Sequence, residues 1–420
     1  MISEHASPLA TQGGVDSGGQ NVYVAYLARE LARCGHSVDV FTRRDSPDLP
    51  RVVQCARNLR VIHVRGGPEQ AIPKEALLPW MTEFSEEVLG WCRAQAEPYD
   101  VVHANFFMSG LAALRLRDEL GLPFVITFHA LGKVRRAHQG KADAFPEARL
   151  DIEQQLVRQA DRIIAECPQD RQDLITHYAA DPARIDVVPC GVNIAELGFG
   201  DGLSRDRLGL PEDAFVILQL GRLVPRKGID NVILALSHLR HQLGIDATLL
   251  VVGGESALPD PVRTPEIARL GAIAASASVA DRVIFTGRRA RADLRDYYCA
   301  ANVFVTTPWY EPFGITPLEA MACARPVIGA AVGGITHTVV NNVTGYLVPP
   351  RDPIALADRL ARLHADPVRA QAFGHAGLQR VRRLFTWKKV AEALIPVYGA
   401  VCASPAADTL DAARMKAASV

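Results

Sequence analysis

The sequence lacks the features that mark several common protein classes. Its eight cysteines are scattered and form no C-x-x-C pair, which favours reduced thiols over a disulfide framework or a zinc site. Its 46 basic and 46 acidic residues cancel, so the charge gives no indication of nucleic-acid binding. No apolar run approaches the about 20 residues of a membrane span, and no signal-peptide pattern is visible. We therefore expect a cytoplasmic protein, and these observations leave open whether it is a monomer or homodimer.

Three nucleotide-binding or metal-binding motifs are also missing. No G-x-G-x-x-G is followed by an acidic residue at a strand end, which counts against a nicotinamide enzyme. No G-x-x-x-x-G-K-[ST] is present, which counts against a P-loop NTPase. No D-x-D pair is present, so we expect neither a required divalent metal nor a cofactor.

Short runs rich in β-branched residues alternate with amphipathic segments along the chain. We expect strands near Val38–Thr42, Val61–Val64, Val101–Ala104, Phe124–Phe128, Arg162–Ala165, Asp186–Pro189, Val216–Leu220, Thr248–Val252, Val283–Thr286, Val303–Thr306, Pro326–Gly329 and Gly345–Val348. The clearest helical patterns are Gln20–Cys34, Asp151–Gln159, Gly228–Gln242 and Ile354–His364. Apolar strands that alternate with helices predict parallel sheets covered on both faces.

Twelve such strands are too many for one comfortable sheet, and the pattern breaks at Val192–Leu210, which is rich in Gly and Asp. We therefore expect an α/β protein with two Rossmann-like, doubly wound parallel-sheet domains that face each other across a cleft. Ligands of such sheets bind beyond the carboxyl ends of the strands.

The stretch Tyr310–Val327, YEPFGITPLEAMACARPV, contains two glutamates eight residues apart. Thr316 and Glu319 have the T-x-x-E spacing of a capping box, so a structural role as a helix cap explains Glu319. No such role explains Glu311, which precedes the helix in a loop. The N-terminus of that helix carries free amides and a partial positive charge, which makes it a candidate anion site.

Two further segments have features of phosphate binding. Gly18 and Gly19 precede an apolar helix, where a ligand can approach bare amides, although an ordinary capped loop also explains them. Arg222 and Lys227 follow a strand, and two cations at the carboxyl edge of a parallel sheet can neutralise a diphosphate, although a solvated loop also explains them. With Glu311 at the same edge, the combination suggests a nucleotide sugar.

His129 follows the expected strand Phe124–Phe128, which places it at the ligand-binding edge of its sheet. A lone histidine is usually packed or solvated, but this position favours a role in a site. Cations follow it in the sequence, and one more lies in another loop: Lys133, Arg135, Arg136, Arg149 and Lys74. Such a charged run is usually a solvated loop, but here it would suit an anionic acceptor.

In combination, these segments resemble the retaining GT-B glycosyltransferases of family 4. The resemblance is strongest to the branch that holds sucrose-phosphate synthase, sucrose synthase and the mycothiol-pathway enzyme that glycosylates inositol phosphate. It covers nearly all of residues 1–402 and rests on an R-x4-K pair followed by an E-x7-E pair. The segments that carry it are SPL…DSGGQNVYVAYLARELA, TFHALGK, IDVVPCGVN, GRLVPRKGID, EPFGITPLEAMACARPVIGAAVGGI, TGYLVPPRDP and FTWKKVAEALIPVY.

The resemblance implies transfer of a hexosyl group, with retention, from a nucleotide diphosphate sugar of the UDP type to a small polar acceptor, phosphorylated or not. The implied catalytic residues are Glu311, His129, Arg222 and Lys227. The implied donor site comprises Gly18, Gly19, Arg222, Lys227, Glu311, Phe313, Gly314, Ile315, Thr316 and Glu319, with Glu311 on the sugar, Glu319 on the ribose and the two cations on the diphosphate. The implied acceptor site comprises Asn21, Lys74, His129, Lys133, Arg136 and Arg149.

The same resemblance implies the division of the chain. The acceptor domain would be residues 1–195, and the nucleotide-sugar domain residues 196–385. A helix at 386–402 would cross back to the first domain. A tail at 403–420 would follow, either a loose helix or disordered.

Two departures from the family pattern stand out. Few residues precede Ser3, so either part of the first strand is not in this sequence or that strand is short. In the inositol-phosphate branch an aromatic hydroxyl and a threonine help to hold the acceptor phosphate, whereas the matching Phe106 and Ala130 carry no hydroxyl. Alternatives are therefore a nucleotide-sugar epimerase or hydrolase of the same fold, a lipid-directed glycosyltransferase, or a catalytically silent protein of this fold.

Overall fold

A computed structural model describes residues 1–10, 18–200 and 202–403. The Asp16–Ser17 part of the predicted glycine loop and the predicted tail from residue 404 onwards lie outside the described residues. The described chain forms two compact units. Of the described residues, unit 1 contains 1–10, 18–189 and 390–403, and unit 2 contains 190–200 and 202–389.

Unit 1 contains two groups of hydrogen-bonded strands. They are β1 (Val38–Arg43), β2 (Val52–Ala56), β3 (Leu59–Val64), β4 (Val102–Asn105), β5 (Phe124–Thr127), β6 (Arg162–Ala165) and β7 (Ile185–Val187). One sheet has the order β1-β3-β2 and the other β4-β5-β6-β7, and every pair is parallel except β2 with β3. The predicted parallel sheets are thus confirmed. The exception is β2, an exposed edge strand that was not predicted and whose residues face no core.

The first four residues lie between these two sheets. Ile2 donates a backbone hydrogen bond to His103 (2.9 Å) and accepts one from Asn105 (2.9 Å), both in β4. On its other side Ser3 donates to Phe41 of β1 (2.9 Å). This short segment thus takes the place of a first strand. On one side of it the next strands are β1 and then β3, and on the other side they are β4 and then β5. The topological switch point of unit 1 is therefore between residues 1–4 and β4.

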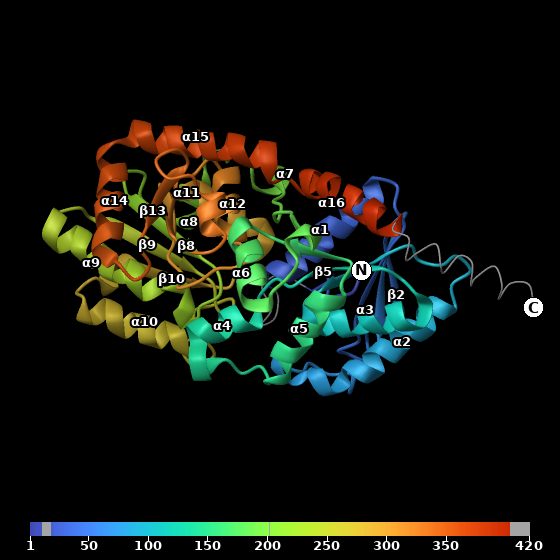
Figure 1. Cartoon of the computed structure of the whole chain (residues 1–420). Coiled ribbons are helices and arrows are strands. Elements are labelled where there is room, and N and C mark those ends of the chain that lie inside the picture. Colours follow the sequence, from blue (N-terminus) through green and yellow to red (C-terminus); the bar gives the residue numbers. More distant parts are fainter. Residues whose placement is uncertain (11–17, 201, 404–420) are drawn as a thin grey trace, which may run out of the picture. The chain divides into compact units, whose positions relative to one another are not determined.

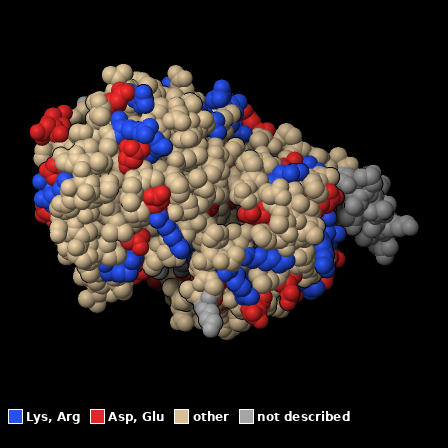
Figure 2. Space-filling model, turned by 60° about the vertical axis from the view of Figure 1, so that its left-hand side comes forward, with Lys and Arg blue, Asp and Glu red and all other residues tan. Residues whose placement is uncertain are grey.

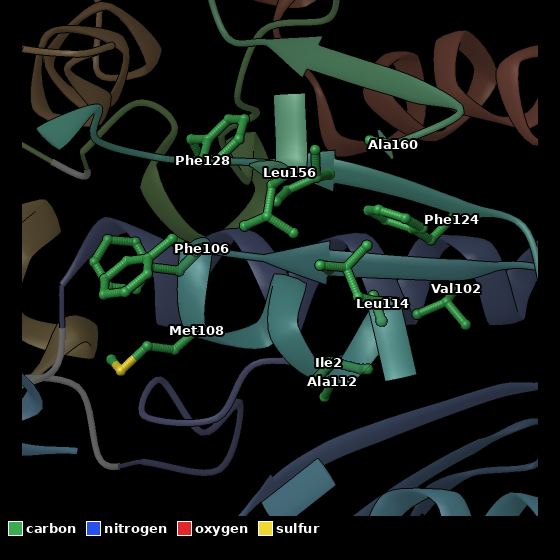
Figure 3. Packing of buried hydrophobic residues seen from close by; sticks show 14 of the residues in the cluster. Ile2, Val102, Phe106, Met108, Ala112, Leu114, Phe124, Phe128, Leu156 and Ala160 are labelled. Carbon is green, nitrogen blue, oxygen red and sulfur yellow. The ribbon is translucent and has the colours of Figure 1, made fainter. Parts of the chain in front are cut away.

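Helices cover the strands of unit 1. They are α1 (Gly19–Arg33), α2 (Met81–Arg93), α3 (Phe107–Leu120), α4 (Gly132–Gln139), α5 (Ala148–Gln159) and α6 (Pro168–Tyr178), with the short 3-10 helices η1 (Lys74–Ala76), η2 (Leu78–Trp80), η3 (Gly140–Ala142) and η4 (Pro182–Arg184). Helix α3 packs beside α2 and α5 (Figure 1). Their apolar side chains meet those of β4 and β5 in one buried cluster, in which Phe124 and Leu156 have no exposed surface (Figure 3).

Unit 2 contains one six-stranded parallel sheet. Its strands are β8 (Phe215–Leu220), β9 (Ala247–Val252), β10 (Val283–Gly287), β11 (Val303–Thr306), β12 (Val327–Ala330) and β13 (Gly345–Val348). Their order is β10-β9-β8-β11-β12-β13. From β8 the chain continues to β9 and β10 on one side of the sheet, and it then returns to β11, β12 and β13 on the other side. The switch point therefore lies between β8 and β11. In open α/β sheets this is where ligands bind.

The helices of unit 2 cover this sheet around a second apolar core. They are α7 (Ile194–Leu197), α8 (Ser204–Leu208), α9 (Ile229–Leu243), α10 (Pro265–Ser276), α11 (Leu294–Ala300), α12 (Ile315–Ala322), α13 (Ile335–Thr338), α14 (Pro353–Ala365) and α15 (Pro367–Leu384), with the 3-10 helices η5 (Pro225–Lys227), η6 (Ala280–Arg282) and η7 (Arg291–Asp293). Helices α9 and α14 pack side by side (Figure 1).

The last helix, α16 (Trp387–Cys402), begins in unit 2 and continues into unit 1. Within unit 1 the Tyr398 hydroxyl lies 2.7 Å from Nδ1 of His103, whose Nε2 lies 2.8 Å from the Thr127 hydroxyl. Burial lowers the pKa of His103 to about 3, so this imidazole is neutral. One of its ring nitrogens donates a hydrogen bond to one hydroxyl, and the other accepts a hydrogen bond from the other hydroxyl. The polar chain ties α16 to β4 and β5.

Candidate active site

The switch point of unit 2 brings together two residues predicted from the sequence. Lys227 ends η5, in the loop after β8, and Glu311 lies in the loop after β11. The Lys227 ammonium donates a hydrogen bond to Glu311 Oε2, and the Arg226 guanidinium lies 4.0 Å from the same oxygen. The two side chains of the ion pair are mostly buried, with 17% and 14% of their surface exposed. Sequence reasoning, which found no structural role for Glu311, missed this ion pair.

The electrostatics of this group favour an anionic ligand. Burial raises the pKa of Glu311, but Lys227, Arg226 and Arg222 outweigh burial and leave the pKa below its ordinary value. Burial lowers the pKa of Lys227, and the two arginines add to this effect while Glu311 opposes it. Three cations thus act on one carboxylate, and the group carries a net positive charge at the sheet edge where ligands of this fold bind.

Two glycines fix the loops that carry these side chains. Gly228 follows Lys227 with φ +65, and a Cβ there would lie 2.0 Å from the backbone oxygen of Thr307, at the end of β11. Gly333 has φ +45, and a Cβ there would lie 2.0 Å from the backbone oxygen of Glu311. Because only glycine permits both the positive φ and the close approach, the sequence holds the two loops against each other and positions the ion pair.

Glu319 does not form the predicted capping box. Helix α12 begins at Ile315 after Gly314, whose φ of 88 starts the helix before Thr316. The Glu319 carboxylate points to other elements instead: Oε1 accepts from Arg291 of η7 (2.6 Å) and Oε2 from the Tyr298 hydroxyl of α11 (2.8 Å). Glu319 is almost fully buried, and each oxygen keeps a further lone pair for a ligand.

The Tyr298 hydrogen bond gives a direct test of this arrangement. Burial and the neighbouring Glu319 raise the pKa of Tyr298 well above its ordinary value, so its hydroxyl remains a donor at neutral pH. Tyr298→Phe should lower the free energy of unfolding by about 1–2 kcal/mol, because a buried bond to a charged acceptor is lost. Urea unfolding of this variant, of Glu319→Gln and of the double variant measures the coupling; additive effects would contradict the bond.

The remaining predicted donor residues lie at two helix starts. In unit 2 Phe313, Gly314, Ile315 and Thr316 form the start of α12, and Phe313 is buried. In unit 1 Gly18 is the cap of α1 and Gly19 its first residue, and a Cβ at Gly18 would meet no atom within 4 Å. Asn21, predicted in the acceptor site, accepts from the Gly18 amide (3.0 Å) and donates to the Ser7 carbonyl (3.0 Å). The structure therefore gives Asn21 a capping role.

His129 lies two residues after Thr127, the last residue of β5, at the predicted edge of the sheet, and both of its ring nitrogens are engaged. Nδ1 lies 3.0 Å from Glu166 Oε1, and Nε2 lies 3.1 Å from Asn105 Oδ1. The Asn105 amide nitrogen donates to the Ile2 carbonyl, which orients its oxygen toward the histidine. Glu166 and Asn105 together fix the orientation of the imidazole ring. His129 also has φ 58, a strained conformation of the kind that clusters at functional sites.

The predicted acceptor cations are paired within unit 1. Lys133 donates to Gln154 (3.2 Å) and to the His177 carbonyl (2.5 Å), and Arg136 lies 3.2 Å from Glu147. Arg149 is 1% exposed and donates to Glu153 (2.7 Å), which is fully buried. The Arg149 guanidinium is also enclosed by the rings of Phe106, Phe107 and Phe145.

Because of these contacts, the predicted acceptor cations differ in how readily they can bind a phosphate. The charge of Arg149 is already balanced by Glu153 inside the unit. Of its guanidinium nitrogens, Nη1 alone has no hydrogen-bond partner among the described residues, so only this nitrogen remains for an acceptor phosphate. The i, i+4 spacing of Arg149 and Glu153 was a signal in the sequence for this pair. Lys74 begins η1 and is half-buried.

Sequence reasoning missed a second histidine–carboxylate pair at the switch point of unit 1. His5 Nδ1 lies 2.6 Å from Glu4 Oε1, and Ser109 donates to the other oxygen of Glu4. The His5 ring packs edge-on against Phe106, whose φ of 85 is also strained. In the sequence the only signal for this pair is that Glu4 and His5 are adjacent. Their position beside β4 follows from the order of the strands in space, which the sequence does not show. Arg226, Arg291 and Tyr298 were missed for the same reason.

Comparison with known proteins identifies the fold and the family. Residues 17–196 match the family described as Glycosyltransferase Family 4, and residues 202–380 match that described as Glycosyl transferases group 1. The D-inositol 3-phosphate glycosyltransferase of Kineococcus radiotolerans is 39% identical over 413 residues, which cover 95% of this chain and 94% of that protein. The chain belongs to glycosyltransferase family 4. It is accordingly an enzyme, a hexosyltransferase with the GT-B fold.

Other relatives of this family 4 glycosyltransferase agree. The D-inositol 3-phosphate glycosyltransferase of Salinispora tropica is 37% identical over 415 residues, covering 95% of this chain and 84% of that protein. The structure of sucrose-phosphate synthase from Thermosynechococcus elongatus is 34% identical, with a TM-score of 0.86 over 95% of this chain and 98% of that one. The Anabaena protein HepE, solved with UDP and glucose, shares the fold at 19% identity and a TM-score of 0.73.

Two surface properties of the family 4 glycosyltransferase bear on its partners. On the face shown in Figure 2, basic and acidic side chains are interspersed, in keeping with the balanced charge of the sequence. Among the described helices, none is both long enough and apolar enough to cross a membrane.

Proposed function

We propose that this enzyme transfers a hexosyl group, with retention, from a nucleotide diphosphate sugar of the UDP type to a small polar acceptor. The observation that carries the donor assignment is the net positive group at the switch point of unit 2. Lys227, Arg226 and Arg222 surround Glu311 there, next to the strand ends where ligands of this fold bind. A diphosphate suits three cations, and the sugar hydroxyls suit the carboxylate.

Each donor residue then has a chemical role. The cations neutralise the charge that develops on the leaving diphosphate, the largest electrostatic demand of the reaction. Amides at the start of α12 donate to phosphate oxygens. Glu311 exchanges its Lys227 contact for donor-sugar hydroxyls near the reacting carbon, and Glu319 accepts from the ribose hydroxyls with its remaining lone pairs.

Retention fits a front-face displacement in which the leaving phosphate takes the proton of the acceptor hydroxyl. A double displacement would need a carboxylate nucleophile, and the ion pair with Lys227 instead suits Glu311 to bind hydroxyls. His129 keeps its Nδ1 contact with Glu166, and its Nε2 exchanges the Asn105 contact for an oxygen of a bound substrate.

The first acceptor to test is D-inositol 3-phosphate, because relatives at 37% and 39% identity carry that name. Support from the structure is mixed. Lys74, Lys133 and Arg136 supply positive charge in unit 1, but Arg149 is enclosed with Glu153, and Phe106 and Ala130 offer no side-chain hydroxyl. We therefore propose polyols and sugars, phosphorylated or not, as the class of acceptor.

The test is a matrix of UDP-hexoses against inositol 3-phosphate, free inositol and sugar phosphates. We expect one UDP-sugar to be consumed only when an acceptor is added, and the product to have the anomeric configuration of the donor by NMR. Consumption without an acceptor would identify an epimerase or a hydrolase instead. Transfer only to a lipid acceptor would contradict a small polar acceptor, and inversion would contradict the mechanism.

The reaction should not need a divalent metal. The cations of unit 2 supply the positive charge that a metal would otherwise provide at the diphosphate. Turnover with the identified donor and acceptor should therefore persist in excess EDTA at the rate seen in buffer alone. Loss of turnover that magnesium or manganese restores would contradict this prediction.

A further inference from the structure

Two cysteines on neighbouring helices lie close to the residues that hold the Glu319 carboxylate. Cys299 lies in α11, next to Tyr298, and Cys323 directly follows α12, four residues after Glu319. Their side chains lie close enough for each thiol to change the pKa of the other. They also face consecutive carbonyls of one segment: Cys323 Sγ lies 3.3 Å from the Leu197 oxygen, and Cys299 Sγ lies 3.7 Å from the Gly198 oxygen.

The two thiols differ in access and in acidity. Cys299 is partly exposed, whereas Cys323 is fully buried. The neighbouring Cys323 thiol lowers the pKa of Cys299 to about 7 against the effect of burial, and Arg325 and Arg295 lower it further. The Cys299 thiol and burial raise the pKa of Cys323 well above its ordinary value. A reachable thiolate beside a sheltered thiol is the arrangement of an attacking and a resolving cysteine.

We propose that Cys299 and Cys323 form a thiol–disulfide switch, closed by a low-molecular-weight disulfide, that controls nucleotide binding at Glu319. The control of binding rests on the proposed function; the formation of the disulfide does not.

The chemistry balances in two exchange steps. The Cys299 thiolate attacks the disulfide RSSR, forms a mixed disulfide and releases one thiolate, RS⁻. Cys323 then loses its proton to water and attacks the Cys299 sulfur, which releases the second RS⁻ and leaves the Cys299–Cys323 bond. The two protein thiols are oxidised, and one disulfide is reduced to two thiols.

The closed bond must move the groups that hold Glu319. A disulfide requires a sulfur–sulfur distance of about 2.0 Å, much shorter than a contact between two thiols. On one side Cys299 packs against the backbone of Gly200, so closely that a Cβ added to this glycine would lie 3.0 Å from the Cys299 Cβ. Closure therefore draws the end of α12 toward α11 and disturbs the Tyr298–Glu319 hydrogen bond. We expect nucleotide affinity to fall at least about tenfold, the equivalent of one lost bond to a charged group.

The experiment treats the whole reduced protein with glutathione disulfide at neutral pH. Peptide mass spectrometry should find one internal disulfide, between the peptides of Cys299 and Cys323. UDP affinity by calorimetry should fall as stated and return after dithiothreitol. The variants Cys299→Ser and Cys323→Ser should keep their affinity through the treatment. The control variant with both exposed cysteines replaced, Cys34→Ser with Cys55→Ser, should respond like the parent protein.

Several results would overturn the proposal. A stable glutathione adduct on Cys299 without the internal bond would show that Cys323 does not resolve it. An internal disulfide that leaves UDP affinity unchanged would refute the switch. If the reduced protein binds no nucleotide at all, the proposed function fails separately. The disulfide map then still decides the pairing, and an unchanged melting temperature on closure would refute the coupling to Glu319.

Discussion

Lys227→Ala is expected to lower kcat/KM for the donor by at least about 100-fold, the usual cost of removing one preorganised charge contact from a transition state. The ammonium lies at the switch point of the unit 2 sheet and contacts the Glu311 carboxylate. On our proposal it stabilises the leaving diphosphate, whose charge grows as the sugar departs. The loss should therefore appear in kcat as well as in KM, which steady-state kinetics with a saturating acceptor will separate.

The same variant has a structural cost that needs a control. Glu311 loses its ion-pair partner, but each side chain keeps about a sixth of its surface exposed. The free energy of unfolding should thus fall by less than the about 3–5 kcal/mol of a fully buried pair. Arg263→Ala, at an exposed loop residue of unit 2, is the matched control and should change neither quantity. A folded Lys227→Ala enzyme within about threefold of the parent in kcat/KM would refute the diphosphate assignment.

Glu311→Gln is expected to lower kcat by at least about 100-fold while nucleotide affinity changes little. The variant keeps the shape of the side chain but removes the charge where the donor sugar lies on our proposal. Glu319→Gln is the matched comparison, because it lies in the same segment and faces Tyr298 and Arg291 instead. It should weaken nucleotide binding and affect kcat at saturating donor much less. Equal effects of both variants on kcat and on affinity would contradict the separation of roles.

The Glu311 variant should also change the acid dependence of stability. The pKa of Glu311 in the folded protein lies below its ordinary value of 4.5. Its contribution to the free energy of unfolding is therefore present above about pH 4.5 and is lost as the pH falls through the lowered pKa. Glu311→Gln should remove this part of the loss between pH 5 and pH 3 in urea unfolding curves. An unchanged acid limb would show that the ion pair contributes nothing to stability.

The sheet edges could be predicted from the sequence, because apolar strands alternating with helices leave little choice of topology. That reasoning brought Lys227 and Glu311 to one edge and His129 to the end of β5, as the structure confirms. Partners contributed by other elements could not be predicted. Glu319 fits a T-x-x-E spacing, but the positive φ of Gly314 starts α12 earlier and turns the carboxylate toward Tyr298 and Arg291.

Two further misses have the same origin. Strand β2 buries no face, so its sequence carries no periodic apolar signal. The enclosure of Arg149 depends on Phe106 and Phe145, which the fold brings together from other segments. Sequence patterns report each element and its cap, whereas the contacts that orient a functional side chain come from residues distant along the chain.

The tie between α16 and strands β4 and β5 also constrains the order of events during synthesis. His103 and Tyr398 are separated by 295 positions in the sequence. At about 5–20 residues per second, a ribosome needs roughly 15–60 s to travel from one to the other. During that time the strands of unit 1 can assemble, but the His103 imidazole still lacks the hydroxyl that satisfies it in the finished protein. Unit 1, although it begins the chain, therefore matures only after unit 2 has been made.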